Sequence, residues 1–326
     1  MSPRPKVVVL DDYEDFLRRG GEWKSLEARA DVQVHTRRLR GDELVRAIED
    51  ADAIVVIRDR TPFKADLIAR LPKLKAFVFT GLRNTQLDFA ALAARGIPVG
   101  NTDHGSSKHS TAEMNWALVL AAAKRLEEFF VLARSGGWRD GGRLPWVLHG
   151  ERLGLIGFGE IGQLVARVGA AFGMEVVTWS PHMTAERAAA GGAASVTLDD
   201  LLATSKVVSL HLVPSAETRK LLDARRLAAM RPDSILVNTA RSALIDMAAL
   251  DKALDAGRPG VAALDVYDDE PLVAGHALAQ RRDVVLSPHL GFVNDPVFEQ
   301  YGPGIVANLL AWMDGKPMPH RVAPAG

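Results

Sequence analysis

The chain of 326 residues contains no cysteine. This absence excludes disulfides, zinc sites built on thiolates and cysteine nucleophiles. Neither sign of charge is in excess, because 40 basic and 40 acidic residues give a formal net charge of zero. No basic stripe indicates a nucleic-acid partner, and no acidic tail indicates a basic one.

Long apolar runs are missing as well. No stretch approaches the roughly 18 apolar residues of a membrane span. The first apolar run, residues 7–10, ends at Asp11 and Asp12, which is too soon for a signal peptide. We therefore expect a soluble, cytoplasmic protein with no membrane partner. The length suggests about two domains, and 48% hydrophobic residues are typical of a globular protein with a sizeable core.

Three glycines at G-x-G-x-x-G spacing form the clearest motif: Gly157, Gly159 and Gly162. They lie between a predicted strand (152–156) and a predicted helix, and a second strand is expected at 175–179. A plain glycine-rich turn needs no such neighbours, whereas a dinucleotide-binding loop does. Gly157 allows the tight turn, Gly159 lets a pyrophosphate approach the backbone, and Gly162 lets the helix pack on the strand. Backbone N–H groups and the helix dipole then favour the phosphate.

Two series of alternating strands and helices predict an α/β fold with two doubly wound parallel sheets. The first series has expected strands at 6–10, 31–35, 53–57, 75–79 and 97–99. The second series has expected strands at 152–156, 175–179, 206–210, 234–238, 261–264 and 283–287. A polar connection, residues 101–110, marks the first crossing between domains, and a final helix at 296–313 is expected to return to the first domain.

A long helix is predicted over residues 111–134. It is apolar nearly all round in its first half, so it must be buried on several sides. A subunit interface and an intramolecular core are both consistent with this pattern. His104 and His109 lie in the polar connection before this helix, but no further ligand stands at a helical metal-binding spacing, so no metal is expected.

Two loops of the first domain follow predicted strands, where ligands bind in open α/β sheets. One carries Arg58 and Arg60, whose guanidinium groups suit anions. The other carries Gly81, Leu82 and Arg83, which offer backbone N–H groups. The alternative is that these are solvated loop charges, above all for Arg60.

Three polar residues follow strands of the second domain: Arg241, Glu270 and His289. The carboxyl ends of parallel strands share one edge of the sheet, where a nicotinamide would lie. An Arg, a Glu and a His at that edge match a carboxylate clamp, a partner that favours the protonated imidazole, and a general acid/base.

Four segments carry a family resemblance: residues 153–162, 238–246, 265–271 and 287–291. In this order they resemble the signatures of the D-isomer-specific 2-hydroxyacid dehydrogenases, which include phosphoglycerate dehydrogenase and glyoxylate/hydroxypyruvate reductases. The resemblance implies a Rossmann NAD(P)-binding domain, residues 104–291, inserted into a flavodoxin-like substrate-binding domain, residues 1–103 and 292–326. It also implies a homodimer formed through the long helix.

The resemblance further implies roles for these residues in the reduction of a small 2-oxo acid to a 2-hydroxy acid. Arg241 holds the carboxylate, His289 donates the proton, and Glu270 hydrogen-bonds the imidazole. Arg58, Gly81, Leu82 and Arg83 bind substrate. The cofactor-binding residues are expected to be Gly157, Phe158, Gly159, Glu160, Ile161, Gly162, Ser180, Pro181, His182, Val213, Pro214, Thr218, Thr239, Ala240, Asp265 and Gly291.

One departure from the family concerns the cofactor. Ser180 stands where an Asp usually binds the adenosine ribose, and no Arg stands beside it to bind a 2′-phosphate. We expect NAD, with NADP possible and weak discrimination between them. The rival class is an NAD-sensing co-repressor-type binding protein on the same fold, and turnover of a 2-oxo acid discriminates the two. The sequence does not name the acid.

Overall fold

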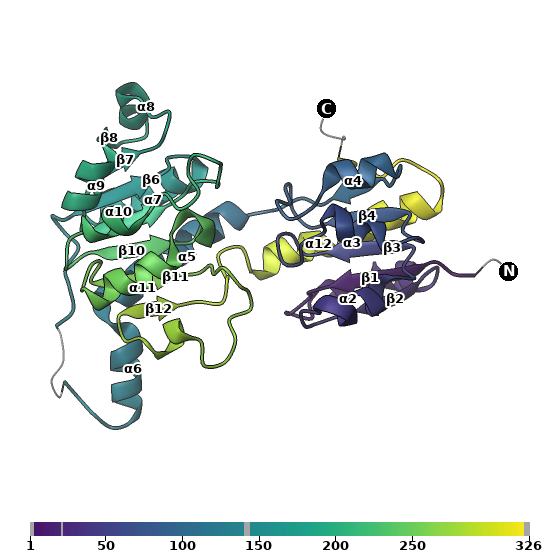
Figure 1. Ribbon diagram of the computed structural model, residues 1–326, viewed down its shortest axis with the longest axis horizontal. Coiled ribbons are helices and arrows are strands. Elements are labelled where there is room, and N and C mark those ends of the chain that lie inside the picture. The colour runs from purple at the N-terminus through teal and green to yellow at the C-terminus, as the bar shows by residue number, and fades with distance from the viewer. Residues whose placement is uncertain (1–2, 21, 140–143, 323–326) are drawn as a thin grey trace. The chain divides into compact units, whose positions relative to one another are not determined.

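The computed structural model describes residues 3–20, 22–139 and 144–322, and it divides into two compact units. Unit 1 consists of Met1–Ser106 and Asn294–Gly326, and unit 2 is Ser107–Val293. Unit 2 is therefore inserted into unit 1. The crossings expected from the sequence, 103/104 and 291/292, lie a few residues earlier than those that the structure has. Figure 1 labels the elements of both units.

Unit 1 contains a parallel sheet of five strands in the order β2-β1-β3-β4-β5. The strands are β1 (Lys6–Leu10), β2 (Asp31–Val34), β3 (Ala53–Val56), β4 (Ala76–Phe79) and β5 (Val99–Asn101). Every residue of β3 and β4 is buried, because helices cover both faces of the sheet. This explains why these strands are continuous apolar runs rather than alternating ones. The order is that of a flavodoxin-like fold.

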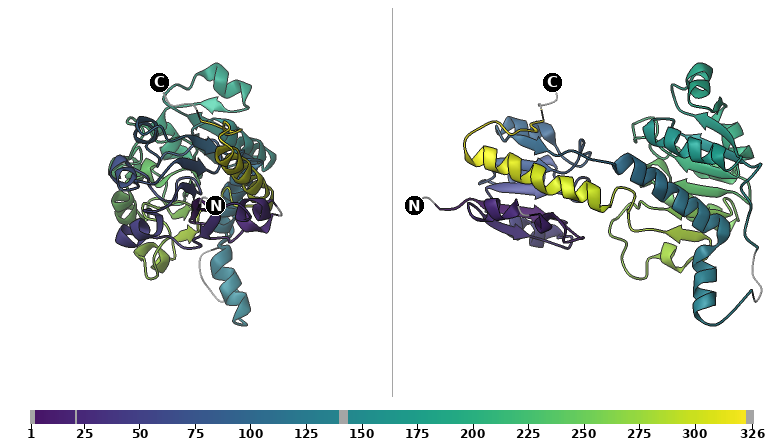
Figure 2. Two further views of the ribbon diagram at one scale, coloured as in Figure 1. Left: turned by 90° about the vertical axis from the view of Figure 1, so that its right-hand side faces the viewer. Right: turned by 180° about the vertical axis from the view of Figure 1, so that it is seen from behind.

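The helices of unit 1 lie in two layers (Figures 1 and 2). One layer contains α2 (Gly41–Ile48), α3 (Ala65–Ala69) and α4 (Phe89–Ala94), and the other contains α1 (Trp23–Glu27) and α12 (Asp295–Met313). A buried amide ties α12 to the sheet, since Asn308 Nδ2 donates to the carbonyl of Asn101 at 2.8 Å. Beyond α12, Arg321 forms an antiparallel bridge with Gly100. The described segment after α12, as far as Val322, is thus built into unit 1.

Unit 2 contains a parallel sheet of seven strands in the order β12-β11-β10-β9-β6-β7-β8. The strands are β6 (Arg152–Ile156), β7 (Glu175–Trp179), β8 (Ala194–Ser195), β9 (Val207–Leu210), β10 (Ile235–Asn238), β11 (Val261–Leu264) and β12 (Val284–Leu286). The chain reverses direction across the sheet between β6 and β9. Such a switch point is where doubly wound sheets bind ligands.

Two apolar cores lie on the two faces of this sheet. One packs α5 (Ser107–Lys124) and α7 (Glu160–Ala171) against the strands, and the other packs α9 (Leu198–Thr204), α10 (Ala224–Ala228) and α11 (Met247–Asp255). The short α8 (Ala185–Ala190) lies beside the edge strand β8. The predicted fold class, two doubly wound parallel-sheet domains, is confirmed.

The single helix expected over 111–134 is wrong. The structure has two helices, α5 and α6 (Leu126–Arg134), separated by Arg125 with a left-handed φ of 55°. The physical difference is burial: α5 packs on the sheet and α7, whereas α6 has no buried residue and projects from unit 2 (Figure 1). None of the described helices is both long and apolar enough to cross a membrane.

Candidate active site

The glycine loop follows directly after β6. Gly157 has a φ of +100°, and a Cβ there would lie 2.7 Å from the backbone carbon of His211. A Cβ on Gly162 would lie 2.6 Å from the carbonyl oxygen of Gly157. The space beside Gly159 is open, with no atom within 4 Å of a Cβ. Gly157 and Gly162 are therefore required by the turn and by helix packing, whereas Gly159 leaves room for a ligand.

The first turn of α7 faces that open space. Gly159 is the N-cap and provides no side-chain hydrogen bond to the helix N–H groups. Uncapped N–H groups at a helix N-terminus favour a phosphate. Phe158 and Ile161 pack their side chains into the core, and Glu160 forms an ion pair with Lys108. The contribution of Phe158 and Ile161 to a phosphate site would therefore come from their backbone.

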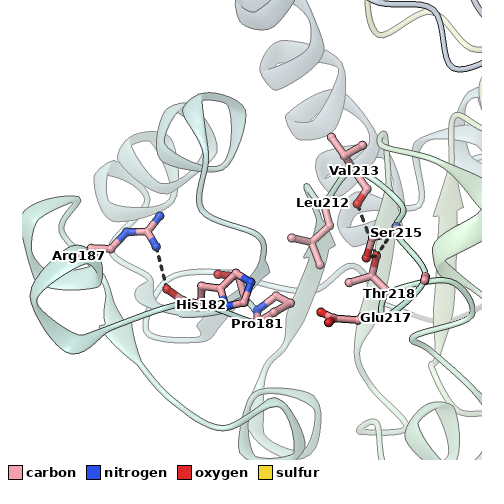
Figure 3. Close-up of a pocket in the computed structure, with 10 residues that line it drawn as sticks. Pro181, His182, Arg187, Leu212, Val213, Ser215, Glu217 and Thr218 are labelled. Carbon is pink, nitrogen blue, oxygen red and sulfur yellow. Dashed lines mark hydrogen bonds between the residues drawn. The ribbon is translucent and has the colours of Figure 1, made fainter. Parts of the chain in front are cut away.

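A cavity of about 550 Å³ lies beyond the end of β7 (Figure 3). Five residues predicted to bind cofactor line it: Ser180, Pro181, His182, Val213 and Thr218. The buried Thr218 accepts a hydrogen bond from the N–H of Ser215 at 2.8 Å and thereby shapes one wall. Pro214 is not among the residues that line the cavity. Its other lining residues, which the sequence analysis missed, are Arg187, Leu212, Ser215, Ala216 and Glu217.

Arg187 is the most informative of the missed residues. It stands in the first turn of α8, where Thr184 accepts a hydrogen bond from its N–H at 3.3 Å. Side chains of a helix lean toward its N-terminus, so the guanidinium points back to the loop after β7. There Nη1 donates to the carbonyl of His182 at 2.7 Å. In the sequence, the only sign that Arg187 would reach this cavity was the capping threonine, Thr184, three residues before it.

Three neighbouring strands carry the predicted catalytic residues at their carboxyl ends. Arg241 follows β10, Glu270 follows β11, and His289 follows β12. The registers pair Asn238 with Leu264, and Leu264 with Leu286, so the three strands end level. The buried Asn238 shapes the first of these turns, because its side chain binds the N–H of Ala240 and the carbonyl of Arg241, both at 2.9 Å.

Glu270 and His289 form a hydrogen-bonded pair. Glu270 Oε2 lies 2.7 Å from His289 Nδ1, and Oε1 accepts the N–H of Tyr267 at 2.9 Å. Burial by itself raises the pKa of Glu270, but the bonds from His289 and Tyr267 and the charge of Arg241 outweigh it. The pKa of this carboxyl consequently lies below its ordinary value, and the group is ionised at neutral pH.

Asp265 holds the loop that carries His289. Its buried carboxylate accepts hydrogen bonds from the hydroxyl of Ser287 at 2.5 Å and from the N–H groups of Leu290 at 2.7 Å and Gly291 at 2.8 Å. Burial raises the pKa of Asp265, and these bonds oppose the rise. Both oxygens of this predicted cofactor residue are thus engaged by the protein itself.

Thr239 and Gly291, two further predicted cofactor residues, contact α5. The Thr239 hydroxyl lies 3.4 Å from Asn115 Nδ2, and the carbonyl of Gly291 accepts a bond from Thr111 at 2.9 Å. Ala240 is partly exposed in the turn before Arg241. In unit 2, the structure therefore brings most of the predicted residues to one edge of the sheet.

In unit 1, Arg58 lies against Gly81. A Cβ on Gly81 would be 3.0 Å from Arg58 Cδ and Nη1, and the N–H of Gly81 donates to Thr102 at 2.9 Å. Leu82 and Arg83 follow as exposed residues. Arg60 is different, because Glu14 binds its guanidinium at 2.7 and 2.9 Å. Its charge is neutralised within unit 1 by an ion pair that is largely buried, so Arg60 is neither a solvated loop charge nor a guanidinium left open for an anion.

The geometry of unit 2 fits a dinucleotide. The open side of Gly159 and the uncapped turn of α7 suit a pyrophosphate, and the cavity after β7 suits an adenosine. Within the described residues, no group of three or more acidic or histidine side chains could hold a metal ion.

Comparison with known proteins agrees with this geometry. The family model "D-isomer specific 2-hydroxyacid dehydrogenase, NAD binding domain" matches residues 116–291. A D-3-phosphoglycerate dehydrogenase of Mycobacterium bovis is 36% identical over 297 residues, which cover 90% of this chain and 56% of the relative. The chain thus spans little more than half the length of that relative.

Two further proteins match along most of their length. A glyoxylate reductase of Aeropyrum pernix is 36% identical over 289 residues, covering 86% of this chain and 85% of the relative. A crystal structure of a phosphoglycerate oxidoreductase from Vibrio cholerae o395 superposes with a TM-score of 0.88 at 32% identity, covering 95% of this chain and 99% of that one. The chain therefore belongs to the D-isomer specific 2-hydroxyacid dehydrogenase family.

Proposed function

We propose that this protein is an NAD(P)-dependent oxidoreductase acting at the 2-position of a small 2-oxo or 2-hydroxy acid, with specificity for the D-isomer. The observation that carries this proposal is the Glu270–His289 hydrogen bond of 2.7 Å beside Arg241, on the sheet edge that also carries the glycine loop. A dinucleotide bound at that loop would supply or accept the hydride. The names of the relatives favour glyoxylate or a phosphorylated 2-oxo acid as the substrate, and hydroxypyruvate stays a prediction from the sequence resemblance.

Arg241, Glu270 and His289 of unit 2 would have different chemical roles in the reaction. The planar fork of Arg241 suits a carboxylate and polarises the neighbouring carbonyl. Glu270 binds Nδ1 of His289, so Nε2 is the ring nitrogen that exchanges a proton with the substrate oxygen. The negative charge of Glu270 stabilises the protonated ring. His289 is thereby the acid in reduction and the base in oxidation.

The substrate residues of unit 1 stay predictions. Arg58 offers a guanidinium beside Gly81. The N–H of Gly81 is already bound to Thr102, so backbone donation to a carboxylate would fall to Leu82 and Arg83.

The test is a panel of 2-oxo acids with NADH and NADPH, assayed with wild type, His289→Ala and the control His109→Ala. Loss of a general acid typically costs about 10²–10⁴-fold in rate, so we expect that fall for His289→Ala with dinucleotide binding retained. His109 is exposed on α5 and should have no effect. Near wild-type turnover by His289→Ala would refute the role of His289. Dinucleotide binding without turnover of any acid would favour a cofactor-sensing binding protein instead.

We also propose a homodimer, with a second copy of the chain covering α6 and the segment after it. Phe130 is 57% exposed, Val131 66% and Trp138 73%, although the three are large and apolar. Leu144 and Val147 extend this apolar surface along the chain. Large exposed apolar patches of this kind mark interaction sites. The proposed interface thus lies on α6, not on the buried α5.

Light scattering after size exclusion tests this interface. Wild type should have twice the mass of one chain, and Val131→Asp should dissociate it. The control Val273→Asp changes an equally exposed valine elsewhere in unit 2 and should leave the dimer intact. A monomeric wild type would refute the proposal. The cytoplasm stays the predicted location.

A further inference from the structure

The end of β7 lacks the acidic residue that marks a preference for NAD. In dinucleotide-binding folds, an Asp or Glu near this point binds the 2′-hydroxyl of the adenosine ribose, whereas a nearby Arg accommodates the 2′-phosphate of NADP. Here β7 ends at Trp179, and the next residues, Ser180, Pro181 and His182, line the cavity. None of these three repels a phosphate dianion.

The structure adds a cation to this cavity that the sequence alone did not place there. Arg187 lines the cavity, and the bond from its Nη1 to the carbonyl of His182 holds the guanidinium beside the loop that follows β7 (Figure 3). No ion pair of Arg187 with a carboxylate occurs among the described residues. The donors of its guanidinium that do not bind His182 can therefore serve a ligand anion.

One carboxylate lines the same cavity. Glu217 lies across it from Arg187 and His182, on the wall that Thr218 and Ser215 form (Figure 3). Glu217 is negatively charged and Arg187 is positively charged, so the two walls of the cavity carry opposite charges. A 2′-phosphate would be stabilised on the wall of Ser180 and Arg187 and weakly repelled from the other.

We propose that this wall binds the 2′-phosphate of an NADP-type dinucleotide, with Arg187 as the residue that determines cofactor specificity. The inference rests on the proposed function, because it assumes that the cavity receives the adenosine end of the cofactor. It reverses the order of preference expected from the sequence, in which the family resemblance placed NAD first and no Arg was found beside Ser180. The Ser180 hydroxyl would add an uncharged hydrogen bond.

Binding of adenosine fragments tests the proposal without any turnover. Isothermal titration should find 2′,5′-ADP bound about tenfold more tightly than 5′-AMP, since a hydrogen bond to a charged group at a partly exposed site is worth about one decade in affinity. Arg187→Gln should abolish this ratio and leave 5′-AMP binding unchanged. Arg187→Lys keeps the positive charge but loses the planar guanidinium with its several N–H donors, so it should retain part of the ratio. Salt should reduce the ratio, because the site is open to solvent.

Two matched variants complete the design. Arg167→Gln removes an exposed arginine of α7 that does not line the cavity and should leave the ratio unchanged. Glu217→Gln should raise the ratio, because it removes the opposing charge. Equal binding of both nucleotides by wild type, or a ratio insensitive to Arg187→Gln, overturns this inference and leaves the proposed function standing. Failure of both nucleotides and both dinucleotides to bind overturns the proposed function as well.

Discussion

At the scale of single residues, the proposed acid–base pair depends on the direction of one hydrogen bond. Glu270 is ionised, because its pKa lies below the ordinary value, so it accepts from Nδ1 of His289. The neutral ring then carries its proton on Nδ1 and its lone pair on Nε2. The hydrogen bond between Nδ1 of His289 and Glu270 is therefore kept whether the ring is neutral or protonated. The proton is gained and lost only at Nε2.

We predict that Glu270→Gln shifts the pH profile of reduction. The amide can keep a hydrogen bond to His289, but the negative charge that favours the protonated ring is lost. The alkaline limb of kcat/KM for reduction should move to lower pH. The pH dependence of kcat/KM with the best 2-oxo acid measures this. Asp268→Asn, an exposed change of the same charge two residues away, is the control, and an unmoved limb in Glu270→Gln would contradict the pairing.

We predict that Arg241→Lys is far from conservative. Lysine keeps the positive charge but cannot bind both carboxylate oxygens with a planar fork. One lost charge-assisted hydrogen bond corresponds to roughly 10–100-fold in kcat/KM. Steady-state kinetics with the best acid check this, with the exposed Arg219→Lys as control. If KM and kcat are both unchanged, Arg241 does not clamp the carboxylate.

At the scale of elements, the β6–α7 junction separates two uses of glycine. A methyl group at position 162 would meet backbone atoms of Gly157, whereas one at position 159 would enter empty space. Gly162 is needed by the folded chain itself. Gly159 is needed only when a ligand is bound.

We predict opposite phenotypes for two alanine variants of this loop. Gly162→Ala should destabilise unit 2 by about 1–3 kcal/mol, the usual cost of overpacking, because backbone must move. Gly159→Ala should leave stability within about 0.5 kcal/mol of wild type and weaken dinucleotide binding. Urea unfolding and NADH fluorescence titration separate the two effects. Equal loss of stability in both variants would show that Gly159 also has a structural role.

Much of the element pattern could be predicted from the sequence. Buried parallel strands are short apolar runs, so β1, β3, β4 and the strands of unit 2 from β9 onward lie close to their expected ranges. Carboxyl ends of parallel strands share an edge, which is why Arg241, Glu270 and His289 could be grouped from the order of strands along the chain. The two-residue β8 was missed, because both its residues are exposed and carry no apolar pattern.

The remaining features depend on geometry that composition does not encode. The break at Arg125 is invisible in the sequence, because arginine is a good helix former and apolar residues continue beyond it. Arg187 reaches the cavity only because of the turn before α8 and the direction of its Cβ bond. Likewise, only the structure shows that the N–H of Gly81 donates a hydrogen bond to Thr102 and that Arg60 is paired with Glu14.

At the scale of the whole molecule, one partly buried histidine, whose Nε2 is shielded from solvent, links stability to pH. His211 follows β9, and among the described residues its buried Nε2 has no hydrogen-bond partner. Burial lowers the pKa of His211 from 6.5 to about 4. Between these values the unfolded chain binds a proton that the folded chain does not, so stability is full above about pH 6.5 and is lost as pH falls toward 4.

We predict that this loss is about 1–2 kcal/mol between pH 7.5 and pH 5, allowing for the partial exposure of the ring. His211→Gln should remove that part of the pH dependence, although it is expected to be less stable at pH 7.5. Urea unfolding at the two pH values, followed by circular dichroism, provides the measurement. His109→Gln, an exposed change in the same unit, should retain the wild-type slope, and the same slope in His211→Gln would contradict the assignment.

The insertion of unit 2 into unit 1 has a consequence for biosynthesis. All residues of unit 2 have been translated once Val293 is made, whereas unit 1 still lacks α12 and the segment that pairs with β5. Because domains generally fold as units while the chain is being made, the inner unit should acquire protease resistance on the ribosome before the outer one. The β1–β5 sheet, although made first, would wait with one face covered only in part by α1, which makes it the part of a nascent chain that a chaperone would most readily recognise.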